Sequence, residues 1–390
     1  MKIYLDHAAT TYVKPQVLSA MMPYFTEHYG NPGGVHSYSR TAKAALDDAR
    51  AKVAAVIGAQ SDEIYFTAGG SESDNLCIRG IAKANAERKG KHIITTNIEH
   101  HAVLHTCEAL EKEGYEVTYL SVDGMGKVTA EQVRDAIRPD TVLVTIMFAN
   151  NEIGTIEPIR EIGAVCKEKG VFFHTDAVQA FGSVPIDVKE MNIDALSISG
   201  HKLYGPKGIG AMYVRRGLRM AQVLTGGAQE RNRRPGTENI PGIVGLGEAA
   251  KLAHETMEQN AKQLTELRNY LIDGVLSRIP FSRLNGSRED RLPNNASFCF
   301  EFVEGEGLLL MLDLKGIAAA SGSACTSGSL DPSHVLLAIG LPHEIAHGSL
   351  RLTLGTDTTR EDIDYVLETL PPIVERLRMM SPLYNVRKDV

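Results

Sequence analysis

The stretches VFFHTDAVQ (171–179) and DALSISGHKLYGPKG (194–208) decide the fold class of this chain. Each begins as an apolar run rich in β-forming residues, which is typical of a strand that is buried on both faces. Each run then gives way to polar residues at the carboxyl end of the strand. In open α/β sheets, ligands bind beyond the carboxyl ends of the strands, so these stretches predict both a fold and the edge that carries its site.

Five further β-rich runs surround these two, and amphipathic helical stretches separate most of them. The runs are IYFT (64–67), HIITT (92–96), EVTYLS (116–121), TVLVTIMF (141–148) and GAMYV (210–214). Strands that alternate with helices predict an α/β fold in which a mainly parallel, seven-stranded sheet lies between layers of helices.

The rest of the chain predicts a second, smaller unit. Outside the alternating region we expect helices over 15–29, 38–57 and 242–278. The segment after residue 280 mixes short strands with helices. We therefore expect a large domain over 15–257 and a smaller α+β domain over 1–14 and 258–390, with the boundary inside the long helix.

The composition is that of a soluble globular protein. Hydrophobic residues make up 43% of the 390 and charged residues 23%, and the net charge of -7 gives no basic footprint for nucleic acid. No apolar run approaches the roughly 18 residues of a membrane span, and Asp6 falls where a signal peptide would be apolar. The cysteines are scattered and odd in number, which argues against disulfides and a zinc site. We expect a cytoplasmic protein with no membrane or nucleic-acid partner and no bound metal.

Two of the predicted strand ends carry groups that suit a phosphate and a ring nitrogen. Gly69-Gly70-Ser71 follows IYFT and opens a helix, with Ser71 as the expected N-cap and Asp74 three residues on. A helix N-terminus binds phosphate through its N–H groups, although a plain capped turn has the same pattern. Asp176 ends its strand, where a carboxylate can pair with a protonated ring nitrogen or can cap a helix.

A third strand end carries Lys202, ahead of the glycine-rich YGPKG (204–208). A partly buried lysine loses its charge readily and can form a Schiff base, whereas a lysine in a surface loop does neither. A phosphate site, a partner for a ring nitrogen and a Schiff-base lysine call for one ligand that carries all three complementary groups. Pyridoxal 5'-phosphate is such a ligand.

A set of motifs covers nearly the whole chain. It includes LDHAATT (5–11), EHHAVL (99–104), NNEIGT (150–155), HTDAVQ (174–179), SGHKLYGPKG (199–208), RPGTEN (234–239), SGSACTSGSLDPSHVL (321–336) and HGSLRLTLG (347–355). With these motifs the sequence resembles the cysteine desulfurases of the class-V aminotransferase family, of the nitrogen-fixation and iron–sulfur-cluster types. The resemblance implies the fold type I of pyridoxal-phosphate transferases, a homodimer and pyridoxal phosphate as the cofactor.

The resemblance also implies roles around the cofactor ring. Lys202 would hold the cofactor as a Schiff base, and Asp176 would pair with the pyridinium nitrogen. Gln179 would bind the ring oxygen. His100 would lie over the ring and take part in proton transfer.

Further residues would hold the phosphate and the substrate. The implied phosphate contacts are Gly70, Ser71, Ser199, His201 and, from the other subunit, Thr237. Asn151 and Arg351 would bind the substrate carboxylate, Arg351 as a bidentate fork, and Asn151 would also lie at the cofactor.

Cys325 is expected to carry sulfur. It lies between small polar residues in SGSACTSGS (321–329), which is typical of a loop tip, although a small buried thiol is the alternative. The resemblance implies that the Cys325 thiolate attacks the sulfur of L-cysteine, that a persulfide forms on Cys325 and that L-alanine leaves. A sulfur acceptor or iron–sulfur scaffold protein would then take the sulfur, and Cys325 would contact metal only transiently, in the acceptor's cluster.

Three other functions share part of this pattern. A selenocysteine lyase has the same scaffold and can act without the catalytic cysteine, and a transaminase releases a keto acid. A non-enzymatic sulfur-relay protein would keep Cys325 but need neither Lys202 nor the cofactor. The i, i+4 pair His101 and His105 and the G-x-G-x-x-A match at 245–250 are weak signals for a metal and a dinucleotide.

Overall fold

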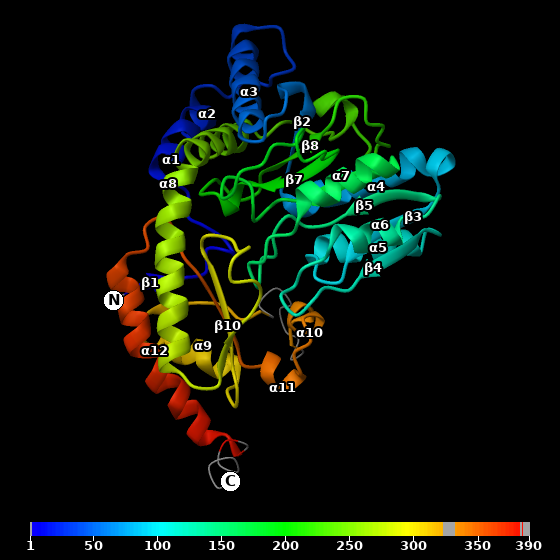
Figure 1. Cartoon of the computed structure of the whole chain (residues 1–390). Helices are drawn as coiled ribbons and strands as arrows, with labels where there is room; N and C mark the ends of the chain where they lie inside the picture. The colour runs from blue at the N-terminus through cyan, green and yellow to red at the C-terminus, as the bar shows by residue number, and fades with distance from the viewer. Residues whose placement is uncertain (1, 323–331, 383, 385–390) are drawn as a thin grey trace.

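Figure 1 shows a computed structural model in which a broad, helix-covered sheet stands above a smaller lobe, with the long helix α8 running along both. The structure describes residues 2–322, 332–382 and 384. Within these residues, no helix combines the length and the apolar character that crossing a membrane requires.

The broad sheet has seven strands in the order β2-β8-β7-β6-β5-β3-β4. Its strands are β2 (Ile64–Thr67), β3 (His92–Thr96), β4 (Glu116–Leu120), β5 (Thr141–Thr145), β6 (Phe172–Asp176), β7 (Ala195–Ser199) and β8 (Gly210–Val214). Every pairing is parallel except those of β8, which runs antiparallel to β2 and β7. The predicted mainly parallel, seven-stranded sheet is therefore confirmed.

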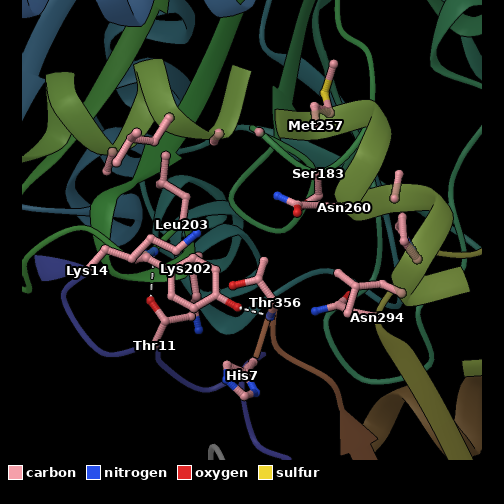
Figure 2. Close-up of a pocket in the computed structure, with 18 of the residues that line it drawn as sticks. His7, Thr11, Lys14, Ser183, Lys202, Leu203, Met257, Asn260, Asn294 and Thr356 are labelled. Atoms are coloured by element: carbon pink, nitrogen blue, oxygen red, sulfur yellow. Dashed lines mark hydrogen bonds between the residues drawn. The ribbon is translucent and has the colours of Figure 1, made fainter. Parts of the chain in front are cut away.

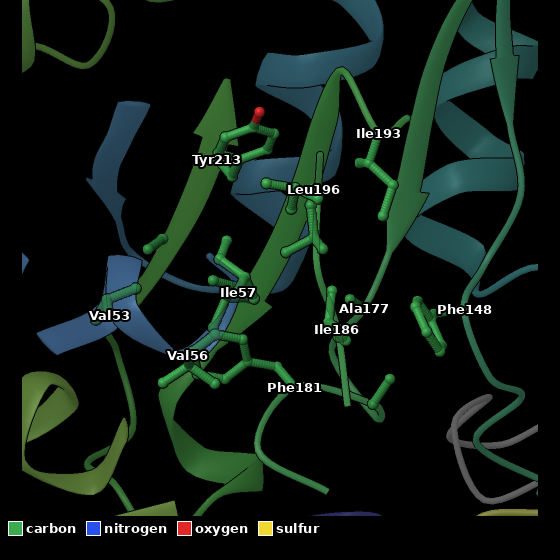
Figure 3. Close-up of a cluster of buried hydrophobic side chains, with 14 of the residues drawn as sticks. Val53, Val56, Ile57, Phe148, Ala177, Phe181, Ile186, Ile193, Leu196 and Tyr213 are labelled. Carbon is green, nitrogen blue, oxygen red and sulfur yellow. The ribbon is translucent and has the colours of Figure 1, made fainter. Parts of the chain in front are cut away.

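Helices cover both faces of the sheet. Neighbouring residues of a strand point to opposite faces, so each strand contributes side chains to both helix layers. On β7, Ala195 packs in a cluster with residues of α4 (Gly70–Lys89) and α5 (His101–Glu111). Leu196, the next residue, packs in a cluster on the other face. That cluster holds residues of α3 (Ser37–Val56), α6 (Ala130–Ala136), α7 (Ile159–Lys169) and α8 (Ile240–Arg278). Figure 3 shows Leu196 and Tyr213 of the sheet with Val53 and Val56 of α3 in this cluster.

The N-terminal helical region differs from its prediction. The expected helix over 15–29 is divided into α1 (Pro15–Met21) and α2 (Pro23–Thr26), because Pro23 has no N–H to continue the helix. The G-x-G-x-x-A match lies inside α8. A Cβ on Gly247 would come within 2.7 Å of Ala49 Cα, so this glycine lets α3 and α8 pack closely.

The smaller lobe has its own core. An antiparallel sheet of order β12-β10-β9 is formed by β9 (Ser282–Leu284), β10 (Asn295–Phe300) and β12 (Ser349–Thr353). The short strands β1 (Ile3–Tyr4) and β11 (Ile317–Ala318) pair in parallel. The other elements of the lobe are α9 (Gly305–Asp313), α10 (His334–Ala338), α11 (His343–Ala346) and α12 (Arg360–Met380).

The long helix α8 joins the two parts. It contributes Leu246 to the cluster against the broad sheet and Leu271 to the cluster that also holds Phe298 and Leu367 of the smaller lobe. This division of α8 supports our proposal that the domain boundary lies at residue 257.

Candidate active site

Three polar segments meet at one edge of the broad sheet. The strands β2, β6 and β7 point the same way, because β8 reverses direction between β2 and β7. Gly70 follows β2, Asp176 ends β6, and Lys202 follows β7 in the short 3-10 helix η2 (Gly200–Lys202). The sequence therefore predicted correctly that these residues share an edge.

The N-terminus of α4 forms a cradle beside β7. A Cβ on Gly70 would come within 2.7 Å of Val178 Cγ2 and 3.7 Å of Ser199 Cβ, so only glycine keeps this space open. The expectation that Ser71 is the N-cap is wrong. Gly69 takes that position, and Ser71 lies exposed in the first turn of the helix. The N–H groups of that turn, the Ser71 hydroxyl and Ser199 at the end of β7 fit a phosphate.

The Lys202 side chain is held by the N-terminal segment of the chain. Its Nζ donates hydrogen bonds to the carbonyl oxygens of Ala8 at 2.5 Å and Ala9 at 2.7 Å. Gln179 Nε2 donates to the same Ala8 oxygen at 3.0 Å. One backbone carbonyl therefore brings together two residues that were predicted to touch the cofactor.

Asp176 is buried at the end of β6, where its Oδ1 accepts a hydrogen bond from the Val178 N–H at 2.9 Å. Burial raises the pKa of its carboxyl, while that hydrogen bond and the charge of Lys202 oppose the rise. A carboxylate in such a place gains strongly from a cation beside it, and a pyridinium nitrogen is a cation of that kind.

Two histidines flank Lys202. His100 caps α5 by accepting a hydrogen bond from the Ala102 N–H at 3.1 Å, and His201 Nδ1 lies 3.1 Å from Thr10 Oγ1. Burial, together with the charge of Lys202, lowers the pKa of both imidazoles to about 4. Both rings are therefore neutral at pH 7.

Arg351 lies in β12 of the smaller lobe, with 2% of its surface exposed. Its Nη1 donates to the Asn151 carbonyl oxygen at 3.1 Å, and its Nη2 donates to Asp6 Oδ1 at 2.9 Å. The Arg351 Nε is buried and has no hydrogen-bond partner among the described residues. This orphaned donor fits a carboxylate ligand. In the structure Asn151 binds Arg351 through its backbone, which the sequence did not predict.

Thr237 is exposed on the segment between the 3-10 helix η3 (Gln229–Asn232) and α8. Arg234, on the same segment, donates from Nε to Glu72 Oε1 at 2.8 Å. Because Glu72 lies in the first turn of α4, this segment runs beside the phosphate cradle. A phosphate contact from Thr237 of another subunit stays a prediction.

Cys325 lies outside the described residues, so its role also stays a prediction. The described residues on either side of that segment both approach Glu152, which sequence reasoning missed. Ser333 Oγ donates a hydrogen bond to the Glu152 carboxylate, and a Cβ on Gly322 would come within 2.8 Å of Glu152 Oε2. The NNEIGT motif that contains Glu152 was the available signal.

Figure 2 shows a crevice that Lys202 helps to line and that lies between the N-terminal segment and α8. It has a volume of about 680 Å³ including its open mouth, and Lys14, Asn260 and Thr356 are among its lining residues. In the described part of the chain no cluster of metal ligands is found, at His101 and His105 or elsewhere.

The fold and the site together define a pyridoxal-phosphate enzyme of fold type I. The open cradle at Gly70, the buried Asp176 carboxyl and the Lys202 amine fit the phosphate, the ring nitrogen and the aldehyde of this cofactor. Residues 3–366 match the Aminotransferase class-V family, and the chain belongs to that family.

Known proteins resemble this chain over nearly its whole length. "Cysteine desulfurase IscS" of Clostridium botulinum (strain Hall) is 58% identical over 386 residues, which cover 98% of this chain and 97% of that protein. A solved "NIFS-LIKE PROTEIN" is 37% identical with a TM-score of 0.90, and the match covers 97% of this chain and 100% of that one. "SspA in complex with cysteine" is 41% identical with a TM-score of 0.81, covering 92% and 100%. These comparisons confirm the class of enzyme that the sequence predicted, the cysteine desulfurases.

Proposed function

We propose that this protein takes sulfur from L-cysteine, holds it on Cys325 as a persulfide and releases L-alanine. The observation that carries this proposal is the meeting of Lys202 and Gln179 at the Ala8 carbonyl, at the sheet edge that also holds Asp176. The name of the IscS relative and the cysteine complex of the SspA structure support cysteine as the substrate.

Each residue has a distinct task in this reaction. Pyridoxal phosphate, when bound, supplies an electron sink for the substrate carbon. Arg351 would bind the substrate carboxylate with its buried Nε, and Asp176 would keep the ring nitrogen protonated. Lys202 Nζ would hold the cofactor aldehyde and, when free, would accept the proton from the substrate Cα.

Transfer of the sulfur atom requires a thiolate. A cysteine thiol is only a few per cent ionised near pH 7, so a base that accepts the Cys325 proton speeds the attack on the substrate sulfur. We assign this task to His100. Its ring is neutral at pH 7, and the charge of Lys202 is the second cause of its low pKa after burial, so its basicity rises when Lys202 is uncharged. An acceptor or iron–sulfur scaffold protein takes the persulfide sulfur.

The active form is proposed to be a cytoplasmic homodimer. Several large apolar side chains are exposed on α1, α2 and the segment after them, which is an apolar surface that a second copy can cover. They are Leu18, Met22, Phe25, Tyr29 and Val35. Cys77, Cys107, Cys166 and Cys299 are buried and form no disulfide, which supports the proposal of a reducing compartment such as the cytoplasm.

The test is to incubate the purified protein with L-cysteine and a reducing thiol, and to measure alanine and sulfide together. Wild type should form both in equal amounts. Lys202→Ala should form neither, whereas Lys207→Ala, at an exposed lysine of the same glycine-rich segment, should behave like wild type. Cys325→Ser should bind the cofactor but form no persulfide. Normal alanine formation by Lys202→Ala would refute the proposal.

A further inference from the structure

Arg351 is held from two directions before any substrate arrives. The Asn151 carbonyl oxygen accepts from Nη1, and the Asp6 carboxylate accepts from Nη2 at 2.9 Å. A guanidinium has five N–H donors in a fixed planar fork, so two such contacts determine where the remaining donors point. The buried Nε is among those remaining donors.

Asp6 also supplies the charge that Arg351 needs. A buried guanidinium is costly unless an anion pairs with it. Among the residues that the structure describes, two acids face Arg351, and they are Asp6 and Glu152. The Glu152 carboxylate accepts from Ser333, and burial raises its pKa to about 7, so Glu152 is a partly protonated partner at neutral pH. The direct ion pair at 2.9 Å is the one with Asp6.

The same short turn reaches the other half of the site. The Asp6 carbonyl oxygen accepts hydrogen bonds from the N–H groups of Ala9 and Thr10, which closes a turn. The carbonyls of Ala8 and Ala9 in that turn bind Lys202 Nζ. Four consecutive residues, Asp6 to Ala9, thus connect the Arg351 guanidinium with the Lys202 amine.

We propose that Asp6 is a positioning residue for substrate recognition: it orients the Arg351 guanidinium toward the carboxylate of an α-amino acid. The inference rests on the proposed function for the role of Arg351. Asp6 itself does not touch the substrate. Its removal should weaken the binding of ligands with a carboxylate and leave ligands without one unaffected.

The experiment uses the holoenzyme and two matched ligands. L-Alanine has the amine and the carboxylate, and ethylamine is the same molecule with a hydrogen in place of the carboxylate; both change the absorbance of the bound cofactor when they bind. We expect Asp6→Ala to raise the dissociation constant of L-alanine by about tenfold, the scale of a lost charged hydrogen bond, with no change for ethylamine. The KM for L-cysteine should rise in parallel while kcat stays within about threefold.

Two control variants separate orientation from charge and from nonspecific effects. Asp6→Asn keeps an oxygen that accepts from Nη2, so its affinity for L-alanine should stay within about threefold of wild type. Asp357→Ala removes an exposed acid that lies 3.8 Å from His7 and should change nothing. If Asp6→Ala does not fold, Asp6→Ser, which is too short to reach Nη2, replaces it with the same expected result.

The outcomes are decisive. Unchanged L-alanine affinity in Asp6→Ala would overturn the inference, and so would an equal loss for both ligands, since that indicates general damage to the site. A wild type that binds L-alanine but releases no sulfide from L-cysteine would refute the proposed function and leave the inference about Asp6 standing.

Discussion

Replacing Glu230 by alanine should destabilise the fold by several kcal/mol. Its side chain is almost fully buried and accepts three hydrogen bonds. Arg50 donates from both Nη atoms at 2.7 Å, and the Phe66 N–H donates at 2.9 Å. Removing one partner of a buried pair leaves an unpaired charge, which costs about 3–5 kcal/mol.

The backbone at Glu230 and the two residues after it is strained, and the hydrogen bonds of the Glu230 side chain offset this strain. Glu230, Arg231 and Asn232 have φ values of 46°, 55° and 63°, so three consecutive residues with side chains adopt the left-handed conformation. Each such residue costs roughly 1–2 kcal/mol. Without Glu230 this turn is expected to relax, and the segment that carries Arg234 and Thr237 then loses its fixed place beside the cradle.

Equilibrium unfolding in urea, followed by far-UV circular dichroism, measures this effect. Glu230→Ala should lower the free energy of unfolding by about 3–5 kcal/mol, whereas Glu238→Ala on the same segment should cost about 0.5 kcal/mol or less. Adding Arg50→Ala to Glu230→Ala should cost little more, because the second change removes the charge that the first one left unpaired. A loss below about 1 kcal/mol for Glu230→Ala would refute this reasoning.

Two further predictions concern pH and packing. Burial raises the Glu99 pKa from 4.5 to about 8, so the native state keeps a proton that the unfolded state loses, and stability falls as the pH rises through that window. Glu99→Gln should flatten the decline of the urea midpoint between about pH 5 and pH 8, and an undiminished decline would contradict the assignment. In α7, a Cβ on Gly163 would overlap the Met191 carbonyl oxygen, so Gly163→Ala should cost roughly 1–3 kcal/mol although alanine favours helices. A higher melting temperature for that variant would be the opposite of what we expect.

The strands could be predicted because apolar runs and turn residues bound them. IYFT is β2 to the residue, and HIITT is β3. The run TVLVTIMF overshoots, because β5 ends at Thr145. Beyond it the N–H groups of Ile146 and Phe148 still bind carbonyls of β6, but β3 no longer pairs on the other side. An apolar run shows that a segment is buried and does not show how many neighbours pair with it.

The site could be predicted where its chemistry is carried by side chains at strand ends. Lys202, Asp176 and Ser199 are examples. The Ala8 and Ala9 carbonyls could not be predicted, because every residue has a carbonyl and only the tertiary fold selects the two that bind Lys202. Asp6 is part of the LDHAATT motif, but its partner Arg351 lies 345 positions away in the sequence. The two residues come into contact because Asp6 forms a β-bridge with Thr353 of β12, the strand that carries Arg351.

The buried acids around the site settle where its negative charge lies. Asp74 faces both Asp176 and Glu99, and carboxylates this close in a buried setting cannot all ionise. Asp74 Oδ1 has no hydrogen-bond partner among the described residues, and burial and these neighbours raise its pKa well above its ordinary value. Burial raises the pKa of Asp176 only to about 6, below the value of about 8 for Glu99, and Asp176 alone of the three has the charge of Lys202 to oppose the rise. Asp74 and Glu99 therefore keep their protons, and the anion lies on Asp176, where the ring nitrogen is expected. It follows that Glu99→Gln should leave the absorbance of the bound cofactor at pH 7 unchanged, whereas Asp176→Asn should change it.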